Sequence, residues 1–258
     1  MALENGLLLH SGRFWAAAVR EDDGSIRVAS GPKPLRSGAP EGGSVPLLRG
    51  LVRLADALAV IPVAKARLRT AVLPLESRRV LGALMGSTVA SAVWRRRGGT
   101  VLSRELGALV LGLAPTLAAL RGSDLAAYHG AEHKSIGEYE RAVSGRPPAE
   151  ATKEHERCGS NLVGPFLLAT VLANLLACGR SGRRTPVRSA VAGAAGLGMA
   201  LEGLRWATTH PRSLLARAMM LPGRALQQSL TTSEPTPEQL EVGERALAEL
   251  LRLERAAV

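Results

Sequence analysis

The chain has few aromatic residues, few cysteines and few lysines. Aromatic residues make up 3% of its 258 residues and apolar residues 46%, so a core must be built from leucine, alanine, valine and glycine. The two cysteines, Cys158 and Cys178, do not form the disulfide framework of a small secreted protein. Residues 1–10 lack the basic stretch that opens a secretory signal peptide. We therefore expect no secretory signal and a reducing compartment.

Arginine supplies most of the formal net charge of +11, because the chain has only four lysines. Nucleic-acid-binding modules are also basic, but they interleave aromatic side chains or show a known binding motif, and we find neither. Two tight arginine clusters, at 95–97 and 180–184, follow directly on apolar runs. Arginines at such positions anchor helix ends at an anionic lipid surface. The charge therefore favours a membrane surface, and we expect no nucleic-acid partner.

Four uncharged apolar stretches occupy the middle of the chain, at 80–94, 106–120, 159–179 and 189–201. Crossing a bilayer takes about twenty residues, and only the third stretch is that long. The other three are either short spans whose flanking arginines reach the headgroups or buried helices of a soluble bundle. The residues alone predict one span and leave the other three stretches open.

The most specific motif is H-G-A-E-H at positions 129–133. Positions i, i+3 and i+4 share one face of a helix, so His129, Glu132 and His133 would lie side by side. Their order is that of the inverted zinc-protease motif, in which two imidazoles bind zinc and the glutamate acts on the bound water. A helix is expected over 126–142, because capping residues precede it and a glycine- and proline-rich segment follows. The alternative is an ordinary polar helix face.

A second pair of metal-binding residue types follows about twenty residues later. His155 and Cys158 are three residues apart, and imidazole and thiolate are the ligands that zinc prefers. With His129 and His133 they would form a set of three imidazoles and one thiolate. Glu140 is a further possible ligand, because it lies on the same helical stripe as His133. The alternative is that Cys158 is a small buried apolar residue and His155 an ordinary loop residue.

Glu202 is an ionisable residue at the end of the last apolar stretch, which makes it a functional candidate if that helix crosses a membrane. It would be either another metal ligand or a carboxylate that orients an imidazole. The alternative is the end of a short helix, where Arg205 would be its ion-pair partner.

These motifs lie within longer recognisable segments: AYHGAEHKSI at 127–136, YE at 139–140, HERCGS at 155–160, LE at 201–202, LPG at 221–223, LTTSEP at 230–235, QLEV at 239–242, ALENG at 2–6 and RFWAAAVR at 13–20. Together they resemble the YqhQ-like family of bacterial membrane proteins over nearly the whole chain. The resemblance implies a multi-pass membrane protein and a metal-dependent enzyme. The chain departs from the family pattern in three ways. The glycine-rich opening is missing or cut short before Met1, residues 155–162 read HERCGSNL where the family has His-Pro-Arg-Cys-Gly-Thr-Ser-Phe, and the apolar segments are shorter. None of them removes a candidate ligand.

The expected fold is therefore mainly α, a multi-pass α-helical membrane protein with a short N-terminal β-hairpin region. The hairpin is expected where Phe14–Arg20 and Ser25–Ala29 flank an Asp-Gly turn. The expected units are a β-hairpin region with a linker at 1–45, an amphipathic helix at 46–79, a helical membrane domain carrying the site at 80–222, and a soluble C-terminal helical tail at 223–258. We expect the site on the cytoplasmic side of the cell membrane, because Cys158 would stay reduced there.

The residues together with the resemblance favour a membrane-embedded metal-dependent enzyme, first of all a zinc hydrolase with Glu132 as the general base. The candidate metal ligands are His129, His133, His155, Cys158, Glu140 and Glu202. A non-catalytic protein with a structural or transported metal is the alternative, because a closed shell of three histidines and one cysteine leaves no position for water. A membrane scaffold or assembly factor is a third possibility. The lipid bilayer is the expected partner under each of these three hypotheses. The sequence indicates no substrate.

Overall fold

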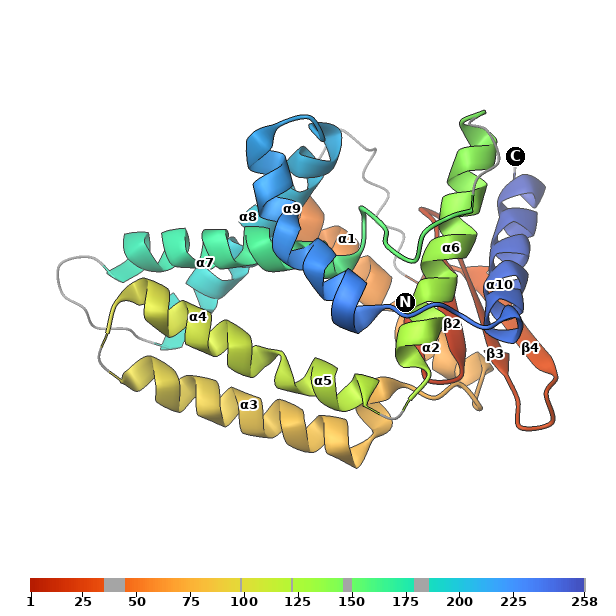
Figure 1. Ribbon diagram of the computed structural model, residues 1–258, viewed down its shortest axis with the longest axis horizontal. Helices are drawn as coiled ribbons and strands as arrows, with labels where there is room; N and C mark the ends of the chain where they lie inside the picture. The colour runs from red at the N-terminus through yellow and green to blue at the C-terminus, as the bar shows by residue number, and fades with distance from the viewer. Residues whose placement is uncertain (35–44, 98, 122, 146–149, 179–185, 258) are drawn as a thin grey trace.

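The computed structural model describes residues 1–34, 45–97, 99–121, 123–145, 150–178 and 186–257 (Figure 1). Most of the Gly/Pro/Ser-rich linker expected before residue 45 and the arginine cluster at 180–184 lie outside the described residues. The strands lie on one side of the molecule, and a long helical hairpin lies on the other (Figure 1).

The N-terminal segment forms a four-stranded antiparallel sheet whose order follows the sequence. Its strands are β1 (Ala2–Leu3), β2 (Gly6–His10), β3 (Phe14–Arg20) and β4 (Ile26–Pro32). The predicted hairpin is the β3–β4 pair, in which Arg20 faces Ile26. Its turn contains Gly24 with a φ of 83°, a left-handed conformation that glycine adopts readily. The sheet is larger than the predicted hairpin because β2 also pairs along β3.

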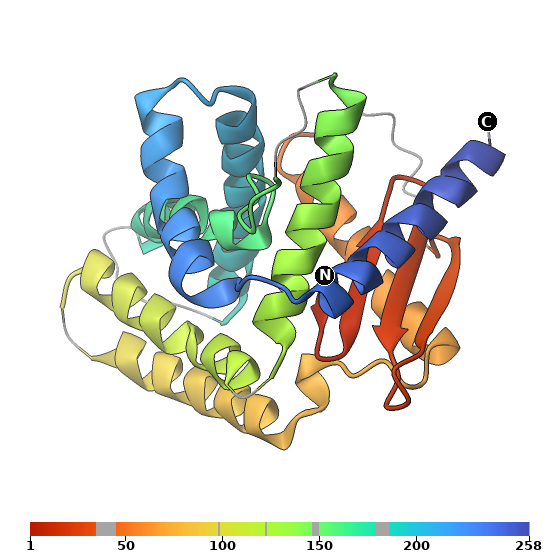
Figure 2. The same ribbon diagram turned by 45° about the vertical axis from the view of Figure 1, so that its right-hand side comes forward.

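Helices cover both faces of this sheet (Figure 2). One face packs on α2 (Val60–Arg67) through Leu3, Leu8, Trp15, Ala17 and Val19. The other packs on α6 (Leu125–Val143) and α10 (Pro237–Ala256) through Leu7, Leu9, Ala16 and Ala18. Since both faces are buried, β2 and β3 are continuous apolar runs rather than alternating ones.

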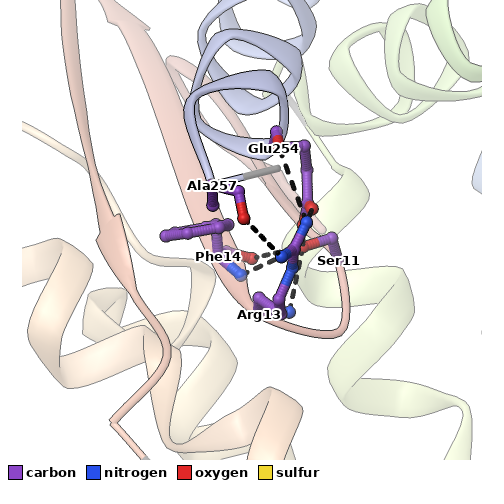
Figure 3. Close-up of polar contacts among 5 residues, drawn as sticks. All are labelled: Ser11, Arg13, Phe14, Glu254 and Ala257. Carbon is purple, nitrogen blue, oxygen red and sulfur yellow. Dashed lines mark hydrogen bonds and ion pairs between the residues drawn. The ribbon is translucent and has the colours of Figure 1, made fainter.

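Helix α10 is fixed to the sheet at its C-terminal end by Glu254 (Figure 3). The Oε2 atom of Glu254 accepts a hydrogen bond from Nε of Arg13 at 3.0 Å, and its Oε1 accepts one from the hydroxyl of Ser11. Arg13 also donates to the carbonyl of Ala257 at 3.3 Å. At the other end, Thr236 and Gln239 form a capping box.

The remaining helices are α1 (Leu48–Leu58), α3 (Arg78–Arg96), α4 (Val101–Gly112), α5 (Ala114–Leu120), α7 (Val163–Cys178), α8 (Pro186–Thr209) and α9 (Leu214–Leu226). Short 3-10 turns occur at Pro74–Glu76 and Gly159–Leu162, and a π-helix at Gln227–Thr231 follows α9. Helix α3 folds back on α4 and α5 as a hairpin, and α7 packs against α4, α8 and α9 (Figures 1 and 2). Helix α6 lies between the sheet and these helices (Figure 2).

The expected multi-pass membrane architecture is wrong. Among the residues that the structure describes, only Leu102–Leu120 is a helical segment long and apolar enough to cross a membrane. Gly159–Ala173, within the stretch predicted to span, is a shorter apolar helix. The stretch at 80–94 is about five residues short of a span, and it folds back against α4 and α5 instead.

Candidate metal centre

Helix α6 carries the H-x-x-E-H motif and places its two histidines side by side. The helix spans Leu125–Val143, close to the predicted range. Asp124 is its N-cap residue, although the capping hydrogen bond expected from such a side chain is not formed. The ring centroids of His129 and His133 are 4.4 Å apart. The i, i+4 spacing therefore produces the expected pair of imidazoles.

Gly130 lets another segment of the chain approach α6 closely. A β-carbon at this position would collide with the carbonyl oxygen of Ser233. The backbone N–H of Ser233 donates to the carbonyl of Ala126 at 2.9 Å, so the chain after the π-helix runs along α6. Glycine inside a helix costs about 1 kcal/mol relative to alanine. Here that cost allows Ser233 to lie against α6, two residues after Thr231, whose carbonyl contacts His129.

Backbone carbonyls orient both imidazole rings. The Nδ1 atom of His129 lies 2.8 Å from the carbonyl oxygen of Thr231, the last residue of the π-helix. The Nδ1 atom of His133 lies 2.5 Å from the carbonyl oxygen of Lys153. Because a carbonyl only accepts, each Nδ1 carries a proton, and in the neutral ring each Nε2 keeps its lone pair. Metal-binding histidines are oriented in this way.

Cys158 completes a cluster of three donor atoms. It precedes the 3-10 turn at Gly159–Leu162 and is buried. Its Sγ lies 3.3 Å from Nε2 of His129 and accepts a hydrogen bond from the hydroxyl of Ser160 at 3.3 Å. The sulfur and one nitrogen each from His129 and His133 lie within 4.8 Å of one another.

The two imidazoles stabilise the thiolate. Burial raises the pKa of Cys158, but its hydrogen bonds with His129 and His133 outweigh burial and lower that pKa to about 5. Burial lowers the pKa of His129, but its contact with Cys158 outweighs burial and raises that pKa. Three electron-pair donors this close together repel one another unless a proton or a metal ion lies among them.

The donor set fits a transition metal. Zinc binds thiolate at about 2.3 Å and imidazole at about 2.0–2.1 Å, so sulfur and nitrogen ligands of a tetrahedral site are about 3.5 Å apart. The 3.3 Å between Sγ of Cys158 and Nε2 of His129 is close to that separation. His129, His133 and Cys158 can therefore hold a metal ion.

His155 and Glu140, two of the predicted ligands, contact each other. The Nε2 atom of His155 lies 3.3 Å from Oε2 of Glu140, and its Nδ1 accepts the backbone N–H of Arg157 at 3.2 Å. The His155 ring lies beside His133, with centroids 5.6 Å apart. Three of the four predicted His and Cys ligands thus converge, while the fourth points its proton-bearing nitrogen at a carboxylate.

Glu132 lies beside the cluster but outside the group of three donors. Its Oε1 accepts a hydrogen bond from the amino group of Met1 at 2.5 Å. Its Oε2 is buried without a hydrogen-bond partner among the described residues. Burial raises the pKa of Glu132, but the amino group of Met1 and the nearby imidazoles outweigh burial and lower it. Glu132 is therefore an ionised carboxylate with one oxygen unpartnered.

The structure does not bring Glu202 to the cluster. It lies on α8 and forms an ion pair with Arg49 of α1, in which Nε of Arg49 is 2.6 Å from Oε1. The hydrogen bond from Arg49 lowers the pKa of Glu202, and Arg205 adds a smaller effect in the same direction. Beside this pair, Gly50 packs closely on Leu201. The contact joins α1 to α8.

Several groups that shape the centre were not predicted from the sequence. The carbonyls of Thr231 and Lys153 are backbone atoms that any residue supplies, so no residue type marks them. Asn161 is fully buried, and its side-chain amide donates to the carbonyls of His155 and Glu156 at 3.1 and 2.8 Å. Asparagine commonly forms such local side-chain-to-backbone hydrogen bonds in turns. This preference is the sequence signal from which the role of Asn161 could have been predicted.

The fold and the cluster define a mainly helical protein with a small antiparallel sheet and a buried His/His/Cys centre. The chain belongs to the protein family of unknown function DUF1385, which it matches over residues 123–253, just over half of its length. The matched region contains the three donor residues and both carbonyls that orient the imidazoles. No curated protein and no solved structure matches the chain.

Proposed function

We propose that His129, His133 and Cys158 bind a transition metal, zinc first, and that the protein is a metal-dependent hydrolase. The observation that carries the proposal is the convergence of these three donors while His155 faces Glu140. Catalytic zinc sites have three protein ligands and one open position, whereas structural sites are closed by four.

The surroundings of the three donors support this proposal. Hydrogen bonds from Nδ1 to the carbonyls of Thr231 and Lys153 present each Nε2 and raise its basicity. The lowered pKa of Cys158 makes its thiolate available at neutral pH, and thiolate is the form that binds metal. The resemblance to the YqhQ-like family also points to metal-dependent chemistry.

Glu132 is the proposed general base. A zinc ion at this site would supply Lewis acidity, which makes a water molecule nucleophilic near neutral pH. Glu132 follows His129 by three residues and precedes His133, and its ionised carboxylate has an unpartnered Oε2. It can take the proton of that water within the cluster.

A non-catalytic metal protein is the rival interpretation. A structural or transported metal in a closed shell needs a fourth ligand, and His155 lies nearest because its ring is beside that of His133. To close the shell, His155 must turn away from Glu140. The rival therefore predicts that His155 is as necessary for metal binding as Cys158.

A thiol hydrolase without metal is a second candidate function. The Cys158–His129 contact of 3.3 Å resembles the thiolate–imidazole pair of enzymes with a cysteine nucleophile. In such enzymes a third group orients the imidazole, and the carbonyl of Thr231 does so here. This candidate requires that activity survive metal removal.

Cobalt loading followed by a hydrolysis screen tests the proposal. Metal-free protein titrated with Co²⁺ should develop a thiolate-to-metal charge-transfer band, and Cys158→Ser should lack it. Zinc-loaded protein should hydrolyse one class in a panel of chromogenic esters, amides and phosphoesters, and chelation should abolish turnover. Absence of the band contradicts the metal site. Metal binding without turnover contradicts the hydrolase, and turnover that survives chelation favours the cysteine nucleophile.

A further inference from the structure

The hairpin of α3, α4 and α5 exposes a large apolar surface. On α3, Met85 is 71% exposed and Val89 63%, and Leu81 and Val93 continue the same four-residue spacing. Along α4 and α5 the exposed apolar side chains are Leu102, Leu106, Val110 and Leu117. We call these eight side chains the apolar hairpin surface.

Little of α3 is covered by the rest of the protein. Within this helix only Val80 and Ser87 are buried, and no charged residue occurs between Val80 and Trp94. The exposed side of an ordinary surface helix is polar, whereas that of α3 is mainly apolar. A row of exposed apolar side chains of this kind marks a partner or a membrane.

Arginines stand at both ends of the hairpin. Its seven arginines are Arg78, Arg79, Arg95, Arg96, Arg97, Arg104 and Arg121. The single carboxylate of this segment, Glu105, is buried and forms an ion pair with Arg95 at 3.1 Å. Residues 78–121 therefore carry a net charge of +6. Two copies of this surface placed face to face would repel each other, which argues against a homodimer.

Trp94 lies where the apolar part of α3 meets the arginine cluster. Its indole N–H donates to the carbonyl of Ser103 at 3.3 Å, and the guanidinium of Arg97 lies 5.6 Å from its ring centroid. Tryptophan and arginine are the residue types that collect at the boundary between acyl chains and headgroups. The composition of this end of the hairpin fits a lipid surface.

We infer that the α3–α5 hairpin is an interfacial anchor that lies along an anionic bilayer. Its apolar hairpin surface enters the boundary between headgroups and acyl chains, and its arginines contact lipid phosphates. The inference concerns a different surface from the His/His/Cys centre and does not depend on metal chemistry.

Two features make the hairpin lie along the bilayer rather than cross it. The uncharged part of the first arm, 80–94, has fifteen residues, or about 22 Å of helix, and the hydrocarbon core is about 30 Å thick. The second arm, Leu102–Leu120, has the length to cross, but it carries Arg104 and Glu105 in its first turn. A crossing would also carry Arg95, Arg96 and Arg97 through that core, which is costly for each charge. An orientation along the surface keeps every arginine at the headgroups.

Vesicle binding tests this inference on the full chain. Purified protein should cosediment with vesicles of phosphatidylcholine mixed with phosphatidylglycerol, and only weakly with vesicles of phosphatidylcholine alone. Salt should weaken the binding. The tryptophan emission should shift to the blue on binding in wild type, and this shift should be largely absent in Trp94→Phe. Failure to bind the anionic vesicles overturns the inference.

Two variants and a matched control assign the binding to the hairpin. Met85→Asn combined with Val89→Asn should weaken binding by about tenfold or more, because it removes buried apolar area. Leu214→Asn combined with Leu221→Asn, on the equally exposed residues of α9, should bind like wild type. If the control pair loses as much binding as the hairpin pair, the hairpin is not the anchor.

The charge contribution and the competing occupant are tested separately. Arg78→Gln combined with Arg96→Gln should weaken binding to anionic vesicles by about fivefold for each arginine removed. Circular dichroism should show an unchanged helix content in every variant. If wild type is a dimer in solution and Met85→Asn with Val89→Asn makes it a monomer, the surface is a self-interface and the inference is wrong.

Discussion

The Sγ atom of Cys158 lies 3.3 Å from Nε2 of His129, although the two residues are 29 positions apart in the sequence. Helix α6 positions the imidazole, and the turn held by Asn161 positions the sulfur. The carbonyl of Thr231, 102 residues after His129, fixes the ring from its other side. Three distant segments therefore meet at this pair of atoms. The protonation of the Cys158 thiol consequently depends on how all three segments are packed.

Cys158 should react as a thiolate at unusually low pH. In metal-free protein carrying Cys178→Ser, so that only one thiol is counted, the rate of alkylation by iodoacetamide should be half-maximal near pH 5. The hydrogen bonds from His129 and His133 favour the charged form, so the thiolate disappears only below that pH. An ordinary thiol loses its thiolate about three to four pH units higher.

His129→Gln is the control for this titration. It removes the imidazole that stabilises the thiolate and leaves the burial that disfavours it, so the midpoint should rise. A wild-type midpoint near that of a free thiol would show that the contact between Cys158 and His129 is not formed in solution.

Metal binding should require three residues and tolerate the loss of a fourth. Wild type should carry about one metal ion per chain after dialysis, and His129→Ala, His133→Ala and Cys158→Ser should each carry almost none. His155→Ala should retain the metal, because His155 contacts Glu140 rather than the cluster. Elemental analysis of the four variants decides between an open and a closed shell. Loss of metal from His155→Ala would support the closed structural site.

Helical periodicity explains how much of the centre was predictable. The i, i+4 spacing of His129 and His133 translates directly into two neighbouring rings, because α6 is regular. The course of the loop that carries His155 and Cys158 has no comparable rule. It depends on contacts such as that of the His155 N–H with the side chain of Gln227, 72 residues later. Residue type alone could therefore propose four His and Cys ligands, and two carboxylates beside them, but could not select the three donors that converge.

Long-range pairing accounts for two other differences. An isolated carboxylate in an apolar stretch suggested a functional role for Glu202, but Arg49, 153 residues earlier, is its partner. Spacing along one helix predicts only local neighbours such as Arg205. The prediction of a multi-pass architecture failed for a related reason. Uncharged residues at 80–94 indicate an apolar helix, but not whether it crosses a bilayer or folds back on α4 and α5.

Gly130→Ala should destabilise the protein although alanine is the better helix former. A β-carbon at Gly130 would collide with the carbonyl oxygen of Ser233, so α6 and the segment after the π-helix must separate. We expect a loss of about 1–3 kcal/mol in the free energy of unfolding, typical of overpacking. Urea denaturation followed by circular dichroism measures it.

Gly82→Ala, in the second turn of α3, is the matched control. No atom lies within 4 Å of a β-carbon built at this position, so only helix propensity changes. The free energy of unfolding should rise by up to about 1 kcal/mol. Equal stabilisation by both substitutions would contradict the close approach of Ser233 to α6. Gly130→Ala should also reduce metal content, because that segment holds the carbonyl that orients His129.

Glu132→Gln should separate catalysis from metal binding. The substitution keeps the size of the side chain and removes its basicity, while His129, His133 and Cys158 remain. Metal content and the cobalt spectrum should therefore match wild type, and hydrolysis should fall by about a hundredfold or more, the usual contribution of a general base. Thermal unfolding provides the control, because Glu132 is buried beside the amino group of Met1 and a neutral amide there could disturb packing. Glu132→Asp should recover part of the activity, since it restores a carboxylate at a shorter reach. A Glu132→Gln protein with unchanged turnover would remove Glu132 from the proposed mechanism, whereas one that loses its metal would make it a ligand.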